Sequence, residues 1–234
     1  MDADDLVFNF TELMAAKTRD FAPRPGYWHR IMGFDIARYG NDKCAAVGLQ
    51  QMGALHWKVF HVEQWDHRDL DYTTGRILSI SNTHKVNDSI IDEDGMGAGP
   101  LDFIIRGRRR DDFRGFRNSG YNEKENKDFA NPRTAAAFKL KELVAKGFIS
   151  IPDEELIQEL MTLRYKFAND GRRILVSKEE MRKKGIKSPN LADSCLMSAF
   201  LIGEIKEQQD RQYRPKQPQY YAADGDLFKI AGIR

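Results

Sequence analysis

Apolar residues are grouped in the first part of the chain in a way that predicts three consecutive strands. Residues 30–37 form a short apolar run that one carboxylate, Asp35, interrupts, and turn-forming residues follow it. Residues 44–50 and 55–64 are two further strand-like runs, separated by four residues. A short apolar run between turn formers is typical of a buried strand, and so short a connection favours antiparallel pairing. The pattern therefore predicts a unit of three antiparallel strands.

Helix and strand signals alternate along most of the remaining chain. Apolar residues recur at three- and four-residue steps in residues 69–83, which predicts a helix. Similar spacing, cap and turn signals predict helices over residues 101–106, 132–146, 153–163 and 189–206, and strands over residues 86–92, 113–117 and 148–151. They also predict a hairpin around Asn169-Asp170-Gly171 within residues 165–177. This order indicates an α/β fold, with a mixed sheet and helices on its faces.

Three segments lack such periodicity. Residues 1–29, where Pro23 and Pro25 disfavour a helix, are predicted to be a leader or linker. Residues 118–131 are predicted to be a mobile loop, and the Pro/Gln/Tyr-rich residues 208–234 a polar tail with weak order. The expected folded domain is residues 30–207.

Composition excludes several classes of protein. Of the 234 residues, 41% are hydrophobic, which suffices for a core, but no apolar run approaches the ~20 residues that span a bilayer. The acidic first residues do not resemble a signal peptide. Two cysteines, Cys44 and Cys195, cannot form a disulfide framework or a four-ligand zinc site. We therefore expect a reduced, intracellular protein that is not bound to a membrane.

Positive charge is concentrated in two blocks, although the net charge is only +2. Residues 106–117 contain six arginines and two acids, and residues 164–187 contain nine Lys/Arg and three acids. Concentrated positive charge suits a polyanion such as nucleic acid. The alternative is that both blocks are solvated faces that keep the protein soluble.

Three carboxylates lie where local physics does not favour them. Asp35 is inside an apolar strand, Asp92 is at the end of another strand, and Asp193 is within the last helix, which is apolar on most of its circumference and is expected to be buried. An ionised Asp in apolar surroundings is costly unless it is paired or binds a cation. Three converging carboxylates without nearby cations are the ligands that a hard divalent metal such as Mg²⁺ prefers. Structural alternatives remain: Asp193 could lie in the first turn of a helix capped by Asn190, and Asp92 could open a turn. A strand interior offers Asp35 no such explanation.

Three motifs resemble those of the nuclease domain of phage terminase large subunits. They are Gly-Phe-Asp-Ile-Ala-Arg-Tyr-Gly-Asn-Asp at residues 33–42, Ile-Ile-Asp-Glu-Asp-Gly-Met-Gly-Ala-Gly at residues 90–99, and the basic segment 177–194 that ends in Leu-Ala-Asp-Ser. They occur in the family's order and spacing, and the resemblance covers roughly residues 30–206.

The resemblance implies an RNase H-like fold, with three antiparallel strands followed by parallel ones, and a metal-dependent endonuclease that cuts double-stranded DNA during viral genome packaging. It places Asp35, Asp92 and Asp193 on the family's metal-binding positions, with Mg²⁺ or Mn²⁺ in a two-metal site. Asp42, Glu93 and Asp94 are further candidates; alternation along a strand points Asp94 the same way as Asp92 and Glu93 the other way. The family often has an additional acid beside the third carboxylate, but this chain has Ala192 and Ser194 there. This departure weakens the expectation of a second metal.

The same resemblance implies partners. Full-length family members carry an ATPase motor, yet this chain has no Gly-x-x-x-x-Gly-Lys-Ser/Thr, so we expect a nuclease unit without a motor. Its expected partners are double-stranded DNA, the terminase ATPase domain, the small terminase subunit and the portal, in the host cell cytoplasm, and the isolated domain is expected to be a monomer.

Cations near the third carboxylate are the expected DNA contacts. They are Arg172, Arg173, Lys178, Arg182, Lys183, Lys184 and Lys187, with Arg133, Lys139 and Lys141 as further candidates on the helix before them. Two rival hypotheses remain at this point: another nuclease of the RNase H superfamily, such as a junction resolvase, and a non-catalytic DNA-docking module.

Overall fold

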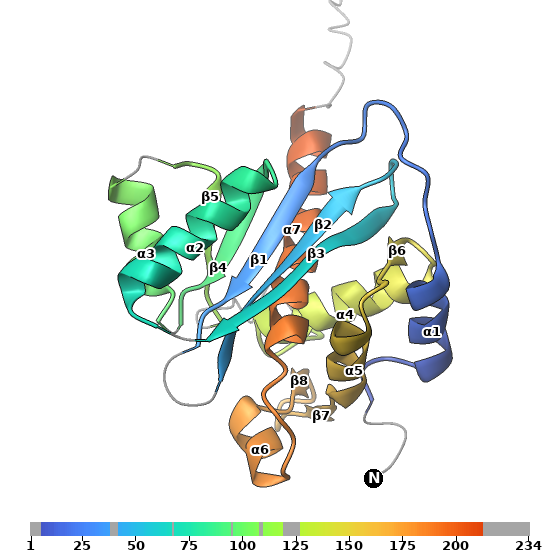
Figure 1. The fold of residues 1–234 in the computed structure, drawn as a ribbon. Coiled ribbons are helices and arrows are strands. Elements are labelled where there is room, and N and C mark those ends of the chain that lie inside the picture. The colour runs from blue at the N-terminus through green and yellow to red at the C-terminus, as the bar shows by residue number, and fades with distance from the viewer. Residues whose placement is uncertain are drawn as a thin grey trace, which may run out of the picture.

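A six-stranded mixed sheet forms the centre of the computed structural model, which describes residues 6–37, 42–66, 68–94, 96–107, 110–118 and 127–212, the last ten of these as helical backbone only. The strand order is β5-β4-β1-β2-β3-β6 (Figure 1). β1 (Arg30–Asp35), β2 (Lys43–Gln51) and β3 (Trp57–Asp66) are antiparallel. β4 (Asp88–Asp92), β5 (Phe113–Phe116) and β6 (Ile149–Ser150) pair in parallel with β1, β4 and β3, respectively. The predicted sheet, three antiparallel strands followed by parallel ones, is confirmed.

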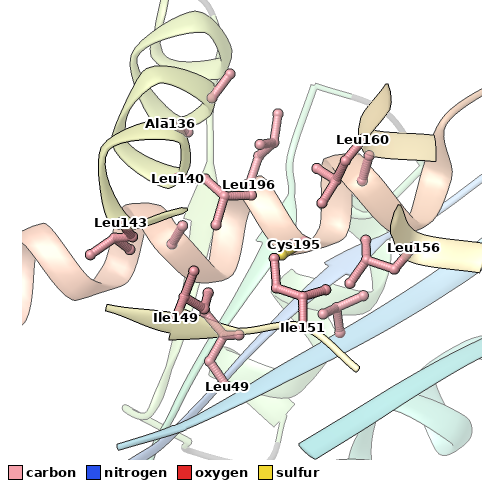
Figure 2. Close-up of a cluster of buried hydrophobic side chains, with 14 of the residues drawn as sticks. Leu49, Ala136, Leu140, Leu143, Ile149, Ile151, Leu156, Leu160, Cys195 and Leu196 are labelled. Atoms are coloured by element: carbon pink, nitrogen blue, oxygen red, sulfur yellow. The ribbon is translucent and has the colours of Figure 1, made fainter. Parts of the chain in front are cut away.

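Helices cover both faces of the sheet. α1 (Phe10–Thr18), α4 (Pro132–Ala145), α5 (Glu154–Thr162) and α7 (Asn190–Gln212) share one hydrophobic core with one face, and α2 (Leu70–Thr83) and α3 (Ala98–Asp102) share a second core with the other. Figure 2 shows the first core, in which Leu140, Leu156 and Leu196 come from three different helices. Side chains of β1 alternate between the two cores: Ile31 lies in the first, and Met32 and Phe34 lie in the second.

Local signals set the helix starts that were predicted. Asp69, Asn131 and Asp153 are the N-caps of α2, α4 and α5, and each side chain accepts a hydrogen bond from a first-turn amide. Pro132 occupies the first position of α4, where a missing N–H costs nothing. The predicted boundaries of these helices are therefore confirmed to within one residue.

A two-stranded hairpin and a short helix lie outside the central sheet. β7 (Tyr165–Phe167) pairs with β8 (Arg173–Leu175), and Gly171 between them has a φ of +83°, a conformation that favours glycine. α6 (Lys178–Lys183) follows the hairpin directly. In Figure 1 these elements lie below the sheet, at the end where β1 finishes. The predicted hairpin is confirmed.

The structure differs from the sequence prediction at the N-terminus. The segment predicted to be a linker contains α1, whose Leu13 and Ala16 are fully buried in the first core. The backbone also connects this segment to distant elements: Val7 N–H donates to Leu163 O, and Ile151 N–H donates to Ala16 O. The linker prediction is wrong for this part of the segment because tertiary contacts, rather than a strong helical pattern, stabilise so short a helix.

Three smaller differences concern later segments. α7 extends to Gln212, past the predicted domain boundary at residue 207. α3 begins three residues before the predicted helix 101–106 and continues as a π-helical turn over Phe103–Gly107. Most of the predicted loop 118–131 lies outside the described residues, but Phe129 forms a β-bridge with Arg173. The predicted tail also lies almost entirely outside the described residues.

In the described part of the chain, no helix is long and apolar enough to cross a membrane.

Candidate active site

Asp35 and Asp92 reach the same place because of strand alternation. Side chains an even number of residues apart on a strand face the same side of the sheet. Asp35 therefore shares a face with Ile31 on β1, and Asp92 shares a face with Ile90 on β4; both isoleucines lie in the first core, on the α7 side. β1 and β4 are parallel neighbours in which Phe34 is opposite Ile91. The next residue of each strand is a carboxylate, so Asp35 and Asp92 end adjacent strands on the face that α7 covers.

α7 lies unusually close to β1 at this point. Gly33 has no side chain, and a Cβ atom there would overlap the backbone oxygen of Ser194. Ser194 Oγ donates a hydrogen bond to Gly33 O at 2.7 Å, and Ser198 Oγ donates to Val47 O at 2.7 Å. These buried contacts place Asp193, the residue before Ser194, beside the end of β1.

The three predicted ligands line one cavity of about 470 Å³. Asp35 and Asp193 are buried, and Asp92 is half-buried. The other polar side chains that line this cavity are those of Asp42, Asp94, Asn118, Arg133, Ser177, Lys178, Arg182 and Asn190. The structure therefore brings the three carboxylates together, at the end of the sheet that the hairpin and α6 flank.

Two cations contact these carboxylates directly. Lys178 Nζ lies 2.7 Å from Asp35 Oδ2 and 3.0 Å from Asp193 Oδ2. Arg133 Nε donates to Asp193 Oδ1 at 2.8 Å. The expectation of converging carboxylates without nearby cations is therefore wrong, because α4 and α6, which are remote from Asp35 in sequence, fold their cations onto the site.

Burial and charge shift the ionisation of this group. Burial raises the pKa of Asp35, although Lys178 opposes the shift. Burial also acts against the Asp193 carboxylate, but Arg133 and Lys178 outweigh it and lower its pKa. The pKa of Asp92 is raised to about 6 by burial and by the charge of Asp35. The charges of Asp35 and Asp193 overcome the burial of Lys178 and raise its pKa. The three carboxylates therefore carry more negative charge than Arg133 and Lys178 neutralise, and this excess is felt at Asp92.

The donor set suits a hard divalent cation, although the side chains are arranged as ion pairs. Among the described residues, no group of three Asp, Glu, His or Cys side chains is positioned as a ready metal site. The ammonium of Lys178 lies between two of the three carboxylates, where it contacts Asp35 Oδ2 and Asp193 Oδ2. Carboxylate oxygens that converge on a cation are the ligands that Mg²⁺ and Mn²⁺ prefer, so Asp35, Asp92 and Asp193 would hold the metal if Lys178 moved.

The remaining acidic candidates separate as predicted, although Glu93 and Asp94 lie in the turn after β4 and not on the strand itself. Asp94 lines the cavity with Asp92, and its carboxylate accepts a hydrogen bond from the Asn118 amide. Glu93 instead pairs with Arg117. Asp42 lines the cavity and pairs with Arg182 at 2.8 Å. Asp94 and Asp42 are therefore close enough to contribute, and Glu93 points elsewhere.

The ten predicted DNA-contacting cations occupy four kinds of position. Lys178, Arg182 and Arg133 line the cavity itself. Four others make local contacts: Arg172 with Asp170, Lys183 with Glu179, Lys139 with Glu142, and Lys141 with the Phe138 ring. Arg173 stacks over Phe129 and Phe138. Lys184 and Lys187 are exposed, and neither forms an ion pair with another described residue.

Sequence reasoning missed some contributors to the cavity. Asn118 belongs to the segment predicted to be a mobile loop, and its side chain accepts a hydrogen bond from Arg133 N–H. Asn190 was considered only as a helix cap, yet its side chain accepts from Ser188 Oγ and lies 3.4 Å from Lys178 Nζ. Ser177 and Glu180 form a capping box that starts α6. That Ser-x-x-Glu pattern is visible in the sequence and could have predicted α6.

Comparisons with known proteins bear on the fold. A scan against models of protein families finds no match, and a search of curated protein sequences finds none either. Among solved structures, a mutant nuclease domain of the large terminase subunit of bacterial virus Sf6, with manganese and beta-thujaplicinol, is similar with a TM-score of 0.66 at 21% identity. That alignment covers 83% of this chain and 98% of the Sf6 domain.

Two other phages provide similar structures. The large terminase nuclease of thermophilic phage G20c with bound magnesium has a TM-score of 0.59 at 15% identity, over 85% of this chain and 98% of that one. The large terminase nuclease domain of Thermus phage P74-26 has a TM-score of 0.52 at 12% identity, over 80% and 93%. This chain therefore has the fold of the nuclease domains of phage large terminase subunits.

Proposed function

We propose that this protein is a metal-dependent endonuclease that cleaves double-stranded DNA during viral genome packaging, and that it is the nuclease part of a terminase large subunit without the ATPase motor. One observation carries the proposal: Asp35, Asp92 and Asp193 come from β1, β4 and α7 and line one cavity. The shared fold with phage terminase nuclease domains supports the same reading, since those domains are named nucleases and two of the structures contain manganese or magnesium.

Asp35, Asp92 and Asp193 would hold Mg²⁺ or Mn²⁺. When bound, two such cations supply an activated water as nucleophile and stabilise the leaving oxygen of the phosphodiester. The residues of the chain have separate tasks in this arrangement. Arg133 holds the Asp193 carboxylate through Oδ1, and Lys178 neutralises Asp35 and Asp193, two of the carboxylates that would hold the metal. Asp94 is the candidate for a second metal, because Asp193 has the uncharged neighbours Ala192 and Ser194.

Cations around the cavity would hold the DNA backbone. The exposed Lys184 and Lys187 follow α6, whose Arg182 lines the cavity. A cluster of carboxylates repels DNA, so flanking cations are needed to recruit the phosphates. Contacts with phosphates carry little sequence information, and we therefore propose binding with strong salt dependence and little sequence preference.

The proposal includes partners and a location. In packaging, the nuclease would act with the terminase ATPase domain, the small terminase subunit and the portal in the host cell cytoplasm, and the isolated domain would be a monomer. These assignments rest on the resemblance of the three motifs and on the shared fold.

A cleavage assay with matched variants tests the proposal. The wild type should cut a linear duplex in Mn²⁺ or Mg²⁺ and not in EDTA, while Asp35→Asn and Asp92→Asn should be folded and inactive. Asp88→Asn is the control for Asp92→Asn: it makes the same change on the same strand, at the opposite end, where Asp88 pairs with His29 and Arg114. Asp88→Asn should cut at close to the wild-type rate.

Other results would favour the rival functions. A strong preference for four-way junctions or RNA–DNA hybrids over linear duplex would indicate another nuclease of the RNase H superfamily. Duplex binding without metal-dependent cleavage under any of these conditions would indicate a DNA-docking module.

A further inference from the structure

Asp193 lies in the first turn of α7, a helix without a capping side chain at the residue before it. The residue before α7 is Pro189, which has neither a hydroxyl nor a carboxylate to accept hydrogen bonds from the first amides. The Asn190 side chain is occupied by Ser188 Oγ. The free amides of this turn therefore need an acceptor from another part of the chain.

Glu159 of α5 supplies that acceptor. Its Oε2 accepts a hydrogen bond from Ala192 N–H at 2.9 Å, and the Leu191 amide interacts with the same carboxylate. Gln64 on β3 donates to the other oxygen, Oε1, at 3.3 Å. Glu159 thus connects the start of α7 to both α5 and the sheet, from a half-buried position outside the cavity.

A second contact holds the other side of Asp193. Ser194 Oγ donates to Gly33 O on β1, and both Ser194 and its partner strand are buried. Asp193 is therefore bracketed: the preceding residue is hydrogen-bonded to Glu159, and the following residue is hydrogen-bonded to the strand that carries Asp35. Rigid support of this kind decides whether ligands lie at the distance that a metal requires.

We infer that Glu159, together with Ser194, is a positioning residue for the metal ligand Asp193. Glu159 touches neither the cavity nor the carboxylates, and it acts by holding the first turn of α7. The inference rests on the proposed function, since it assumes that Asp193 binds metal. Its consequence is that loss of the Glu159 hydrogen bonds weakens metal binding without removing a ligand.

Calorimetric titration of Mn²⁺ into the folded protein, without DNA, tests this inference. Glu159→Ala should weaken Mn²⁺ binding by about tenfold or more, the range found when supporting residues of metal sites are removed. Glu159→Gln keeps an oxygen that can accept from Ala192 N–H, so its affinity should stay within about threefold of the wild type. Ser194→Ala tests the second contact, should Glu159→Ala fail to fold, and should also weaken binding.

Asp153→Ala is the matched control. Asp153 caps α5 by accepting from Leu156 N–H at 2.8 Å, so this variant loses the same kind of hydrogen bond away from α7. It should lower the melting temperature and leave the Mn²⁺ affinity unchanged. Unchanged affinity in Glu159→Ala and Ser194→Ala, or equal weakening in Asp153→Ala, would overturn the inference while the proposed function stands. Absence of Mn²⁺ binding by the wild type would instead overturn the proposed function, and the inference with it.

Discussion

The first turn of α7 and the whole of α6 both deliver a charged side chain to the cavity, but the chain supports them very differently. Residues 190–194 are all buried. In α6, a six-residue helix, only Met181 is buried. The carboxylate of Asp193 is thus held by the core, whereas the cation Lys178 is held by a short surface helix. Under the proposed function, we therefore expect a bound metal to displace Lys178 and to leave Asp193 in place.

Asp193→Asn changes the carboxylate that the core supports, and it should have the largest effect on cleavage. The amide has nearly the same shape but no charge to bind metal, and a bound cation provides several kcal/mol of transition-state stabilisation. We expect cleavage to fall by about a thousandfold or more, as measured by single-turnover assays. Mn²⁺ should also raise the melting temperature of the wild type more than that of the variant. A folded variant that cuts at the wild-type rate would contradict the role of Asp193.

Charge reversal on the exposed side of α6 tests whether this helix also recruits DNA. Arg182→Glu, Lys183→Glu and Lys184→Glu together should lower duplex affinity by about ten- to a hundredfold. Three lost phosphate contacts should reduce the salt slope of log affinity by about 3. Thermal stability should hardly change.

The control for this triple variant makes the same change in net charge elsewhere. Reversal of Lys17, Lys58 and Lys146, on α1, β3 and the residue after α4, should leave the salt slope unchanged. If both triple variants bind DNA equally, the cations of α6 only keep the protein soluble.

Lys178→Met removes the displaceable cation and should reveal the competition. In EDTA the variant should lose about 2 kcal/mol of unfolding free energy, because Asp35 and Asp193 lose a cation, although Asp193 keeps Arg133. The Lys178 side chain is 29% exposed, which reduces the cost below that of a fully buried pair. Mn²⁺ should restore this stability and bind more tightly than to the wild type. Weaker Mn²⁺ binding by Lys178→Met would show that the lysine supports the metal site rather than competing for it.

The pH dependence of stability tests the ionisation of Glu159, which supports the first turn of α7. Burial raises the pKa of Glu159 from 4.5 to about 7, against its hydrogen bonds from Ala192 and Leu191 and with help from the charges of Asp193 and Glu155. The folded protein therefore binds more protons than the unfolded chain between these pH values, and its stability falls as pH rises through them. Relative to Glu159→Gln, the wild type should lose about 1–2 kcal/mol between pH 4.5 and 8, as measured by urea unfolding. Parallel pH profiles for the two proteins would contradict this shift.

Ser177→Ala should have the smallest effect. Ser177 Oγ accepts from Glu180 N–H at 3.1 Å as half of the capping box, and loss of such a cap costs about 1 kcal/mol. Because α6 has little other support, hydrogen exchange should accelerate in α6 and stay the same in α7. Equal acceleration in both helices would show that they unfold as one unit.

Sequence predicted the sheet, most helices and the three carboxylates because each leaves a local signal. Asp35 interrupts an apolar strand, and Asn131-Pro132 begins a helix, whatever the rest of the chain does. The cations on the carboxylates leave no such signal: Lys178 is 143 residues from Asp35, and Arg133 is 60 residues from Asp193. α1 likewise depends on remote partners, since it packs against α4, α5 and β6, more than a hundred residues later in the chain. Two helix starts did have readable signals that the predictions did not use: Ser177-x-x-Glu180 at α6 and Asn9-x-x-Glu12 at α1.

The order of these elements along the chain also has a consequence for synthesis. β1 and β4 leave the ribosome early, but Asp193 enters on α7, the last element that the structure describes. A nascent chain that stops before α7 lacks one of the three carboxylates and exposes the sheet face that this helix covers. Completion of the first core and convergence of the three carboxylates therefore both wait until α7 has been synthesised.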